Sequence, residues 1–326
     1  MRYRVRRDRL LPGVPFLTVF RRGVPVLCLF GAMLFCPRAV FEGTRSGLLL
    51  WAETVFPTLF PFMLVSGLMV SCGGITLVAK LFGRASSTVF GTSDAGAYAV
   101  LTGFLCGYPM GAKSAADLVR TGSITREEGA YLLSFCNNVS PGFIINYVVW
   151  GTLGREDLLL PTLLILTGVP VFLSFPFRYL YRSGRRRFPK NVRKTGSGDR
   201  SFDLAALDSG LNDSYEAIVH VGLYIIFFSI LIRLFQEMTG ALPVIRFVLP
   251  LLEITGGIRM LGNDIPDMTV CYPLVLGLTS FGGFCAAAQT RSMLKGTGIP
   301  MSPYIIQKLT AAAAASLLGF LYLYLS

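Results

Sequence analysis

Long apolar blocks, each close to a bilayer-spanning length, constrain this chain more than any other feature of its sequence. A helix needs about 20 predominantly apolar residues to cross the hydrocarbon core. Of the 326 residues, 53% are hydrophobic and 15% are charged, whereas a soluble domain carries about 25% charged residues. Every backbone group in lipid needs a hydrogen-bond partner within the protein, so the blocks predict helices. We therefore expect an all-α integral membrane protein with about seven or eight transmembrane helices.

Two basic segments predict the orientation. Residues 1–22 hold seven Arg and one acid, and residues 182–200 hold eight Lys or Arg and one Asp. Cytoplasmic loops carry such an excess of basic residues, so we place both segments, and the N-terminus, in the cytoplasm. The bilayer, and not nucleic acid, is then the partner that the net charge of +12 indicates. No A-x-A cleavage site follows the first apolar run, which favours a retained first helix over a signal peptide.

The apolar blocks are of two kinds. We expect uninterrupted spans at residues 23–40, 48–71, 158–181, 215–235 and 305–325, a polar turn at 42–45 and an amphipathic stretch at 73–92. Residues 95–122 break at Gly107–Gly111 and are predicted to form a re-entrant hairpin, because an even number of crossings must separate the two cytoplasmic segments. Further breaks are expected at Asn137–Gly142 and at Gly282–Gly283, and residues 239–264 give no clear pattern.

Two internal alignments suggest a duplication. Residues 107–122 (GYPMGAKSAADLVRTG) align without gaps with residues 283–298 (GFCAAAQTRSMLKGTG), and residues 53–68 align with residues 216–231. The predicted topology makes the halves antiparallel, and inverted repeats with paired broken segments are typical of transporters. Chance similarity between Gly- and Ala-rich helices is the alternative. We divide the chain into a first helix with its basic leader, two repeats and a basic linker, at residues 1–46, 47–181, 182–213 and 214–326.

The hairpin break gives the first candidate site. Glycines and a proline free backbone groups that membranes tolerate only where protein covers them or a cavity is lined. Lys113 would lie in the first turn of the following helix, whose N-terminus attracts anions, although it can also reach the interface as an ordinary surface lysine. The run GYPMGAKS nearly matches a phosphate-binding loop, but Ala112 replaces its second Gly and a membrane segment precedes it. The candidate binding residues here are Gly107, Tyr108, Pro109, Gly111, Lys113 and Ser114.

Other polar residues inside apolar segments complete the prediction. Asn137, Asn138 and Ser140 either bind substrate or form helix–helix hydrogen bonds. Gln289 and Arg291 are candidate substrate ligands near the second break. Glu53, Glu216 and His220 are candidate coupling or gating groups, because ionisable residues in spans are often functional. Interfacial positions are the alternative for these three.

Glu253 and Arg259 are expected to pair with each other. The seven Cys form no CxxC pair and are expected to be small buried hydrophobes. We expect no metal site, no cofactor and no enzymatic activity.

Several motifs resemble a known family. The segments WAETVFPTLFPFMLVSGL, GFLCGYPMGAKSAADL, LLSFCNN followed by SPGF, and LLEITGGI are similar to those of the YlbJ-type sporulation integral membrane proteins, or stage V sporulation protein V. The resemblance covers roughly residues 47–325. It implies a nucleoside-recognition, or Gate, domain in the outer forespore membrane of an endospore-forming bacterium. It also implies transport of dipicolinic acid, a planar aromatic dicarboxylate, towards the forespore.

We therefore expect a transporter for a small organic anion, most simply dipicolinate, which can also be a homo-oligomer. A transporter for a nucleoside or another small solute is the first alternative. A non-transporting membrane scaffold or signalling protein of sporulation is the second.

Overall fold

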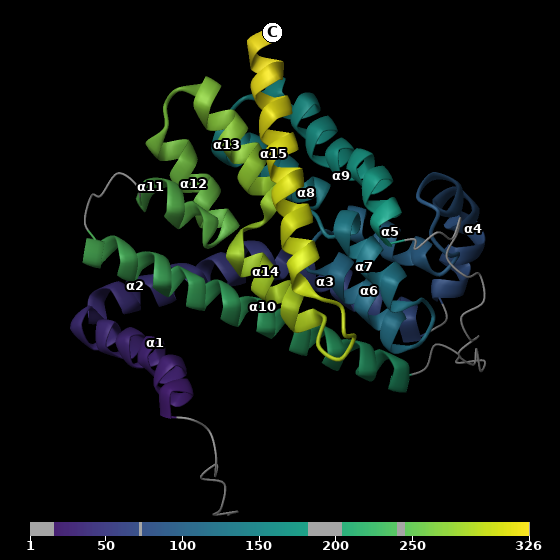
Figure 1. The fold of residues 1–326 in the computed structure, drawn as a ribbon, viewed down its shortest axis with the longest axis horizontal. Helices are drawn as coiled ribbons and strands as arrows, with labels where there is room; N and C mark the ends of the chain where they lie inside the picture. Colours follow the sequence, from purple (N-terminus) through teal and green to yellow (C-terminus); the bar gives the residue numbers. More distant parts are fainter. Residues whose placement is uncertain (1–15, 72–73, 182–203, 240–244, 326) are drawn as a thin grey trace, which may run out of the picture.

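The computed structural model describes residues 16–71, 74–181, 204–239 and 245–325, and every regular element within them is helical (Figure 1). Within this part of the chain, six helical stretches are long and apolar enough to cross a membrane. They are Pro37–Val65, Arg126–Leu153, Glu156–Tyr181, Gly210–Thr239, Met268–Met293 and Met301–Leu325. Gly23–Phe35 and Gly96–Cys106 are shorter apolar helices. The predicted helical membrane protein is confirmed. The basic segment at 182–200 lies outside the described residues.

The first two spans differ from the prediction in where the chain breaks. Helix α1 (Phe16–Phe35) ends at Cys36, and Pro37 begins the next helix. That helix continues without interruption through α2 (Pro37–Leu49), a π-helical segment η1 (Leu50–Val55) and α3 (Phe56–Ser71). The predicted polar turn at residues 42–45 is therefore wrong. Polar side chains do not interrupt a helix, whereas proline lacks the N–H of a continuing turn and favours the first helical position.

The predicted hairpin is present. Amphipathic helix α4 (Gly74–Val89) precedes α5 (Gly96–Cys106), and α6 (Met110–Arg120) follows a break at Gly107, which has a φ of +79°. The hydroxyl of Thr102 donates to that of Ser114 at 2.8 Å. Residues placed on either side of the break thus face each other, so α5 and α6 fold back on one another.

The next helix is broken in its middle, as predicted. Helix α7 (Arg126–Cys136) stops before four non-helical residues, 137–140, and α8 (Pro141–Phe143) then continues into the π-helical η2 (Ile144–Leu153). Pro141 and Gly142 begin the second half-helix and do not belong to the break, because proline suits the first turn of a helix. A short 3-10 turn, η3 (Glu156–Leu158), leads to the uninterrupted α9 (Leu159–Tyr181).

The second half repeats this order. It contains a long helix, α10 (Leu204–Thr239), then α11 (Ile245–Val248), η4 (Leu249–Leu251) and α12 (Ile254–Asp264) around a break. A second broken helix follows, α13 (Met268–Phe281) and α14 (Gly283–Met293), and α15 (Met301–Leu325) is the last span. Residues 204–213 belong to α10, so the helix begins inside the predicted linker.

One spacing relates the two halves. Pro109 and Glu253 at the hairpin breaks, Asn138 and Gly282 at the helix breaks, and Tyr181 and Leu325 at the ends of α9 and α15 are each 144 residues apart. Helix α4 lies between the long first helix and the hairpin, and it has no counterpart among the described residues of the second half. The repeated order supports a duplication.

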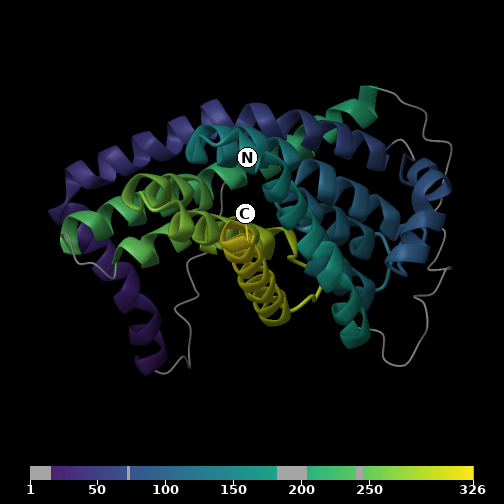
Figure 2. The ribbon, with the colours of Figure 1, turned by 90° about the horizontal axis from the view of Figure 1, so that it is seen from above.

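The long helices of the two halves run antiparallel. Cβ atoms built at Gly43 and Gly47 would lie 2.7 Å from Ile230 Cα and 2.8 Å from Ile226 Cα, so the backbones of α2 and α10 nearly touch. Further along, the Trp51 indole N–H donates to the Ile218 carbonyl at 3.1 Å. Partner numbers fall as residue numbers rise, which is the relation that inverted repeats require. Figures 1 and 2 show these helices side by side along one edge of the molecule.

The structure changes the internal alignment. The sequence match paired α6 with α14, whereas the element order pairs the hairpin α5–α6 with α11–α12 and the broken helix α7–η2 with α13–α14. Helices α6 and α14 look alike because each starts beside glycines of positive φ, namely Gly107 and Gly282. Similar local conformation, and not repeat position, produced that match.

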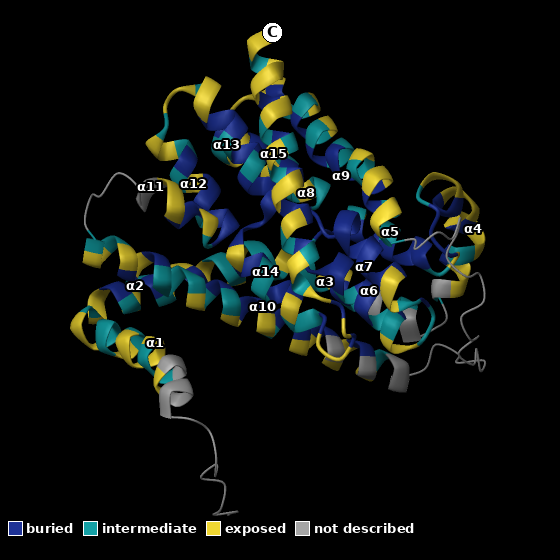
Figure 3. Cartoon of the chain, viewed as in Figure 1, coloured by how far each residue is buried: buried dark blue, intermediate teal, exposed yellow. Residues whose placement is uncertain are grey.

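The core lies where the breaks meet. Figure 3 shows buried residues concentrated in α5 to α7 and α12 to α14, with exposed positions on the outer faces of α1, α9 and α15. Four Cys (Cys106, Cys136, Cys271 and Cys285) are buried as predicted, but Cys28 is exposed and Cys36 is partly exposed.

Candidate functional site

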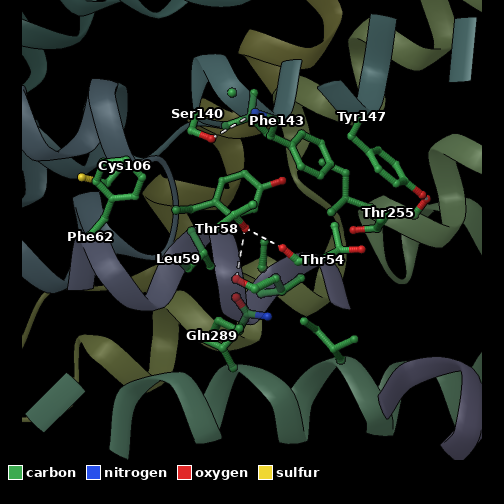
Figure 4. Close-up of a pocket in the computed structure, with 18 of the residues that line it drawn as sticks. Thr54, Thr58, Leu59, Phe62, Cys106, Ser140, Phe143, Tyr147, Thr255 and Gln289 are labelled. Carbon is green, nitrogen blue, oxygen red and sulfur yellow. Dashed lines mark hydrogen bonds between the residues drawn. The ribbon is translucent and has the colours of Figure 1, made fainter. Parts of the chain in front are cut away.

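A cavity of about 470 Å³ lies between the two halves of the chain (Figure 4). Its walls come from the long helices of both halves, from both hairpin breaks and from both broken helices. They are formed by Thr54, Val55, Pro57, Thr58, Leu59, Phe62, Leu105, Cys106, Tyr108, Val139, Ser140, Gly142, Phe143, Asn146, Tyr147, Val221, Ile225, Glu253, Ile254, Thr255, Cys285, Ala286 and Gln289. The cavity thus occupies the interface at which the two halves meet.

The backbone breaks contact each other in pairs beside this cavity. In the first half, the Tyr108 N–H donates to the Asn138 carbonyl at 2.6 Å. In the second half, the Cys285 N–H donates to the Leu252 carbonyl at 2.8 Å. Each hairpin break is therefore held by the broken helix of its own half. Backbone groups that leave a helix inside a membrane need such partners.

Tyr108 links the two halves. A Cβ at Gly282 would lie 3.4 Å from Tyr108 Cε1, so the ring packs over the break of the second broken helix. The Tyr108 hydroxyl is buried and has no hydrogen-bond partner within the described residues. A buried hydroxyl without a partner costs free energy relative to one that is hydrogen-bonded. A ligand in the cavity would provide the missing acceptor or donor.

Glu253 contributes the one carboxylate of the lining. Its side chain is 2% exposed, and its Oε1 and Oε2 accept the N–H groups of Thr255 at 2.9 Å and Gly256 at 2.7 Å. It therefore caps α12, whose N-terminal dipole favours a negative charge. The expected ion pair with Arg259 is not among the salt bridges of the described residues, because the carboxylate points to the helix N-terminus and Arg259 is exposed.

The rest of the lining is apolar or neutral and polar. Phe143 and Tyr147 stack with their ring centroids 5.0 Å apart, and the Tyr147 hydroxyl donates to the Thr255 carbonyl at 2.7 Å. Figure 4 shows Ser140, Thr54, Thr58 and Gln289 around the same space. No Lys, Arg or His occurs among the described lining residues. The cavity suits a small solute with an aromatic ring and neutral hydrogen-bonding groups.

A comparison with characterised proteins identifies one relative. The chain is 28% identical over 323 residues to the sporulation integral membrane protein YlbJ of Bacillus subtilis strain 168, covering 89% of this chain and 79% of that protein. This similarity confirms the predicted resemblance to the YlbJ-type sporulation integral membrane proteins. No family model matches the chain, and no solved structure matches it.

The structure places three of the predicted binding residues in the cavity wall, namely Tyr108, Ser140 and Gln289. Gly107, Pro109 and Gly111 shape the hairpin instead of lining the cavity. A Cβ at Gly107 would lie 2.6 Å from the Ser140 nitrogen, and one at Gly111 would lie 2.9 Å from the Cys136 carbonyl carbon. These glycines allow the hairpin backbone to touch the broken helix.

The predicted charged ligands lie elsewhere. Lys113 Nζ forms an ion pair with Asp117 Oδ2 at 2.9 Å, and Asp117 Oδ1 also pairs with Arg120. Ser114 bonds to Thr102 within the hairpin, and Arg291 is exposed. These three predicted residues do not line the cavity. Lys113 lies on a helix as predicted, but its ammonium group pairs with Asp117 one helical turn later and not with a ligand.

Asn137 and Asn138 form helix–helix hydrogen bonds and do not line the cavity. Asn137 is fully buried, and its Oδ1 accepts the Ala112 N–H at 3.2 Å. Its Nδ2 donates to Thr290 Oγ1 at 3.0 Å and to the Tyr304 hydroxyl at 2.9 Å. One amide thus joins α6 of the first half to α14 and α15 of the second. Helix–helix hydrogen bonding was the alternative to substrate binding that the sequence left open for these two asparagines.

The candidate coupling residues Glu53, Glu216 and His220 are all exposed and lie outside the cavity lining. Sequence reasoning gave the buried Glu253 only a role as a partner of Arg259, and it did not single out the buried Lys308. Lys308 lies within the span α15 and is 2% exposed. An ionisable residue inside an apolar span is the signal that could have found it.

Proposed function

We propose that this YlbJ-type protein transports a small planar solute through the cavity between its two halves. The supporting observation is the convergence of four backbone breaks, two from each antiparallel half, on one cavity. Secondary transporters with inverted repeats bind their substrates at such an interface, near broken helices. A scaffold protein has no need for unwound helices around an internal space.

Dipicolinate is the first substrate to test, because the family resemblance implies it. The cavity volume of about 470 Å³ falls in the range of small-molecule sites. The rings of Tyr108, Phe143 and Tyr147 offer faces for a planar pyridine ring, and the free Tyr108 hydroxyl offers a hydrogen bond. On this proposal the protein lies in the outer forespore membrane with its N-terminus in the cytoplasm.

The charge of the lining limits the form in which dipicolinate is carried. Glu253 is the carboxylate of the wall, and no basic side chain of the described lining opposes it. Bringing a dianion out of water beside a like charge is costly, since the interaction strengthens as the dielectric constant falls. We therefore propose that dipicolinate enters with compensating protons or a bound cation.

The same observation favours a second candidate. A neutral solute with an aromatic base and hydroxyl groups, such as a nucleoside, meets no charge conflict in this cavity. Ser140, Thr255 and Gln289 provide donors and acceptors for it, and Glu253 can accept from a hydroxyl.

Uptake into proteoliposomes distinguishes the candidates. Purified protein is reconstituted, and accumulation of labelled dipicolinate is measured at several pH values, with and without a divalent cation and with nucleosides as competitors. Uptake that rises at lower pH or with the cation supports the first candidate. Saturable nucleoside uptake without dipicolinate uptake supports the second candidate. If the folded protein shows no saturable uptake of either solute, the result favours a non-transporting scaffold.

A pair of tyrosine variants tests the cavity itself. Tyr108→Phe removes a hydroxyl that has no partner in the described protein, so stability is expected to be unchanged or slightly higher. The KM for the substrate is expected to rise about 2- to 10-fold, the equivalent of one net hydrogen bond. Tyr272→Phe is the matched control, because the Tyr272 hydroxyl bonds to Thr162 away from the cavity. Equal uptake kinetics for both variants and the unmodified protein would exclude the proposed site.

A further inference from the structure

Lys308 is held at the break of the first broken helix, although it belongs to the last span of the second half. Its Nζ donates to the Asn137 carbonyl at 3.1 Å and to Asn138 Oδ1 at 3.2 Å. Both acceptors are formally neutral, and no salt bridge within the described residues includes Lys308. Lys308 is nevertheless almost completely buried. A lysine in this position needs a physical reason.

The reason lies in the end of α7. The last carbonyls of a helix have no partner within it, and together they place a partial negative charge at its C-terminus. Helix α7 ends at Cys136, inside the protein, and water does not replace the missing partners of a buried end. The Asn138 amide donates its Nδ2 to the Phe135 carbonyl, which turns its Oδ1 towards Lys308. The break therefore presents a carbonyl oxygen and an amide oxygen to a cation.

In ion-driven carriers, the unwound carbonyls and the C-terminal ends of half-helices coordinate the driving ion, such as Na⁺. Here the neighbouring residues Val139 and Ser140 line the cavity, so the break has the position of such an ion site. A lysine ammonium is a compact positive charge with three donors, and it fills the same electrostatic role.

We propose that Lys308 is a built-in cation that occupies a monovalent-cation site at the C-terminus of α7. The protein therefore needs no alkali cation at this position, and shortening Lys308 opens the site to Na⁺ or K⁺. The inference goes beyond the proposed transport function, and it stands or falls on ion binding rather than on uptake.

The test compares melting temperatures of the purified full-length protein in detergent, in NaCl, KCl and N-methyl-D-glucamine chloride of equal ionic strength. The unmodified protein is expected to melt at the same temperature in all three. Lys308→Ala leaves the two oxygen atoms without a cation, so it is expected to melt several degrees lower in N-methyl-D-glucamine and to recover in NaCl or KCl. Lys113→Met is the control for removing a lysine, and its melting temperature is expected to be independent of the cation.

Lys308→Met covers the case in which the alanine variant does not fold. Its side chain keeps the length of the lysine stem and fills the space, so it is expected to melt below the unmodified protein and to show no recovery in Na⁺ or K⁺. A methionine variant as stable as the unmodified protein would show that the ammonium has no role. An alanine variant that melts equally in all three salts would refute the cation site. Because uptake is not measured, either result leaves the proposed substrate cavity to its own test.

Discussion

Replacing Gly111 with alanine is expected to separate the hairpin from the broken helix. Gly111 is the second residue of α6, and it packs against the end of α7. An added Cβ would lie 2.9 Å from the Cys136 carbonyl carbon and 3.0 Å from Asn137 Cα. Carbon atoms pack best at about 3.5–4.0 Å, so the two backbones would have to move apart by at least about 0.5 Å.

The magnitude follows from what has to move. The atoms in contact belong to the backbone on both sides, so no flexible side chain can swing away. Overpacking of a well-packed interior costs about 1–3 kcal/mol and occasionally more. The shift also lengthens the bond from the Ala112 N–H to Asn137 Oδ1, which is already 3.2 Å. We therefore expect Gly111→Ala to lose about 2–4 kcal/mol of stability, which combines the overpacking with one weakened buried hydrogen bond.

The assay is thermal unfolding in detergent, followed by the monodisperse fraction that remains after heating. Gly168→Ala is the matched control, since Gly168 lies within α9 and an added Cβ there meets only Phe172, at 4.0 Å. Alanine in an open helical position is expected to be neutral or stabilising by up to about 1 kcal/mol. Equal melting temperatures for the two variants would refute the close contact between hairpin and broken helix.

Two further predictions concern the contact between the halves. Asn137→Ala is expected to lower stability by about 1–3 kcal/mol, because it removes the hydrogen bonds to Thr290 and Tyr304 of the second half and leaves the Ala112 N–H buried without an acceptor. Asn146→Ala, at an exposed residue, should change stability little, and thermal unfolding compares the two variants. Gly47→Ala is expected to lower stability by about 1–3 kcal/mol through overpacking against α10. Gly31→Ala, which has nothing within 4 Å, is its control, and a stable Gly47 variant would argue against close packing of the two long helices.

The sequence was a good guide to the places where the helices break. Glycine at Gly107 and Gly282 marks backbone with φ of +79° and +88°, and such conformations favour glycine whatever surrounds them. Asn137 and Asn138 marked the third break because adjacent amides inside an apolar span need partners. The fourth break, at Glu253, was missed, since the chain there contains no glycine of positive φ and a capped helix start looks like any other polar position.

The sequence was a poor guide to which polar residues face the cavity. Lys113 and Arg291 have the charge that an anion site needs, but Lys113 pairs with Asp117 and Arg291 is exposed. Whether a lysine is satisfied by a neighbour on its own helix or points into a site depends on side-chain direction and on the elements packed against it. Lys308 shows the converse, because its partners lie about 170 residues away in the chain.

The sequence by itself determined that this is a helical membrane protein, because about 20-residue apolar blocks have few other stable forms. It also located the strained backbone of the breaks, which is a local property. Only the tertiary structure decided which breaks meet, how the two halves correspond and which side chains surround the cavity at their interface. Those relations join segments that lie far apart in the sequence, and they depend on packing between helices that no local pattern specifies.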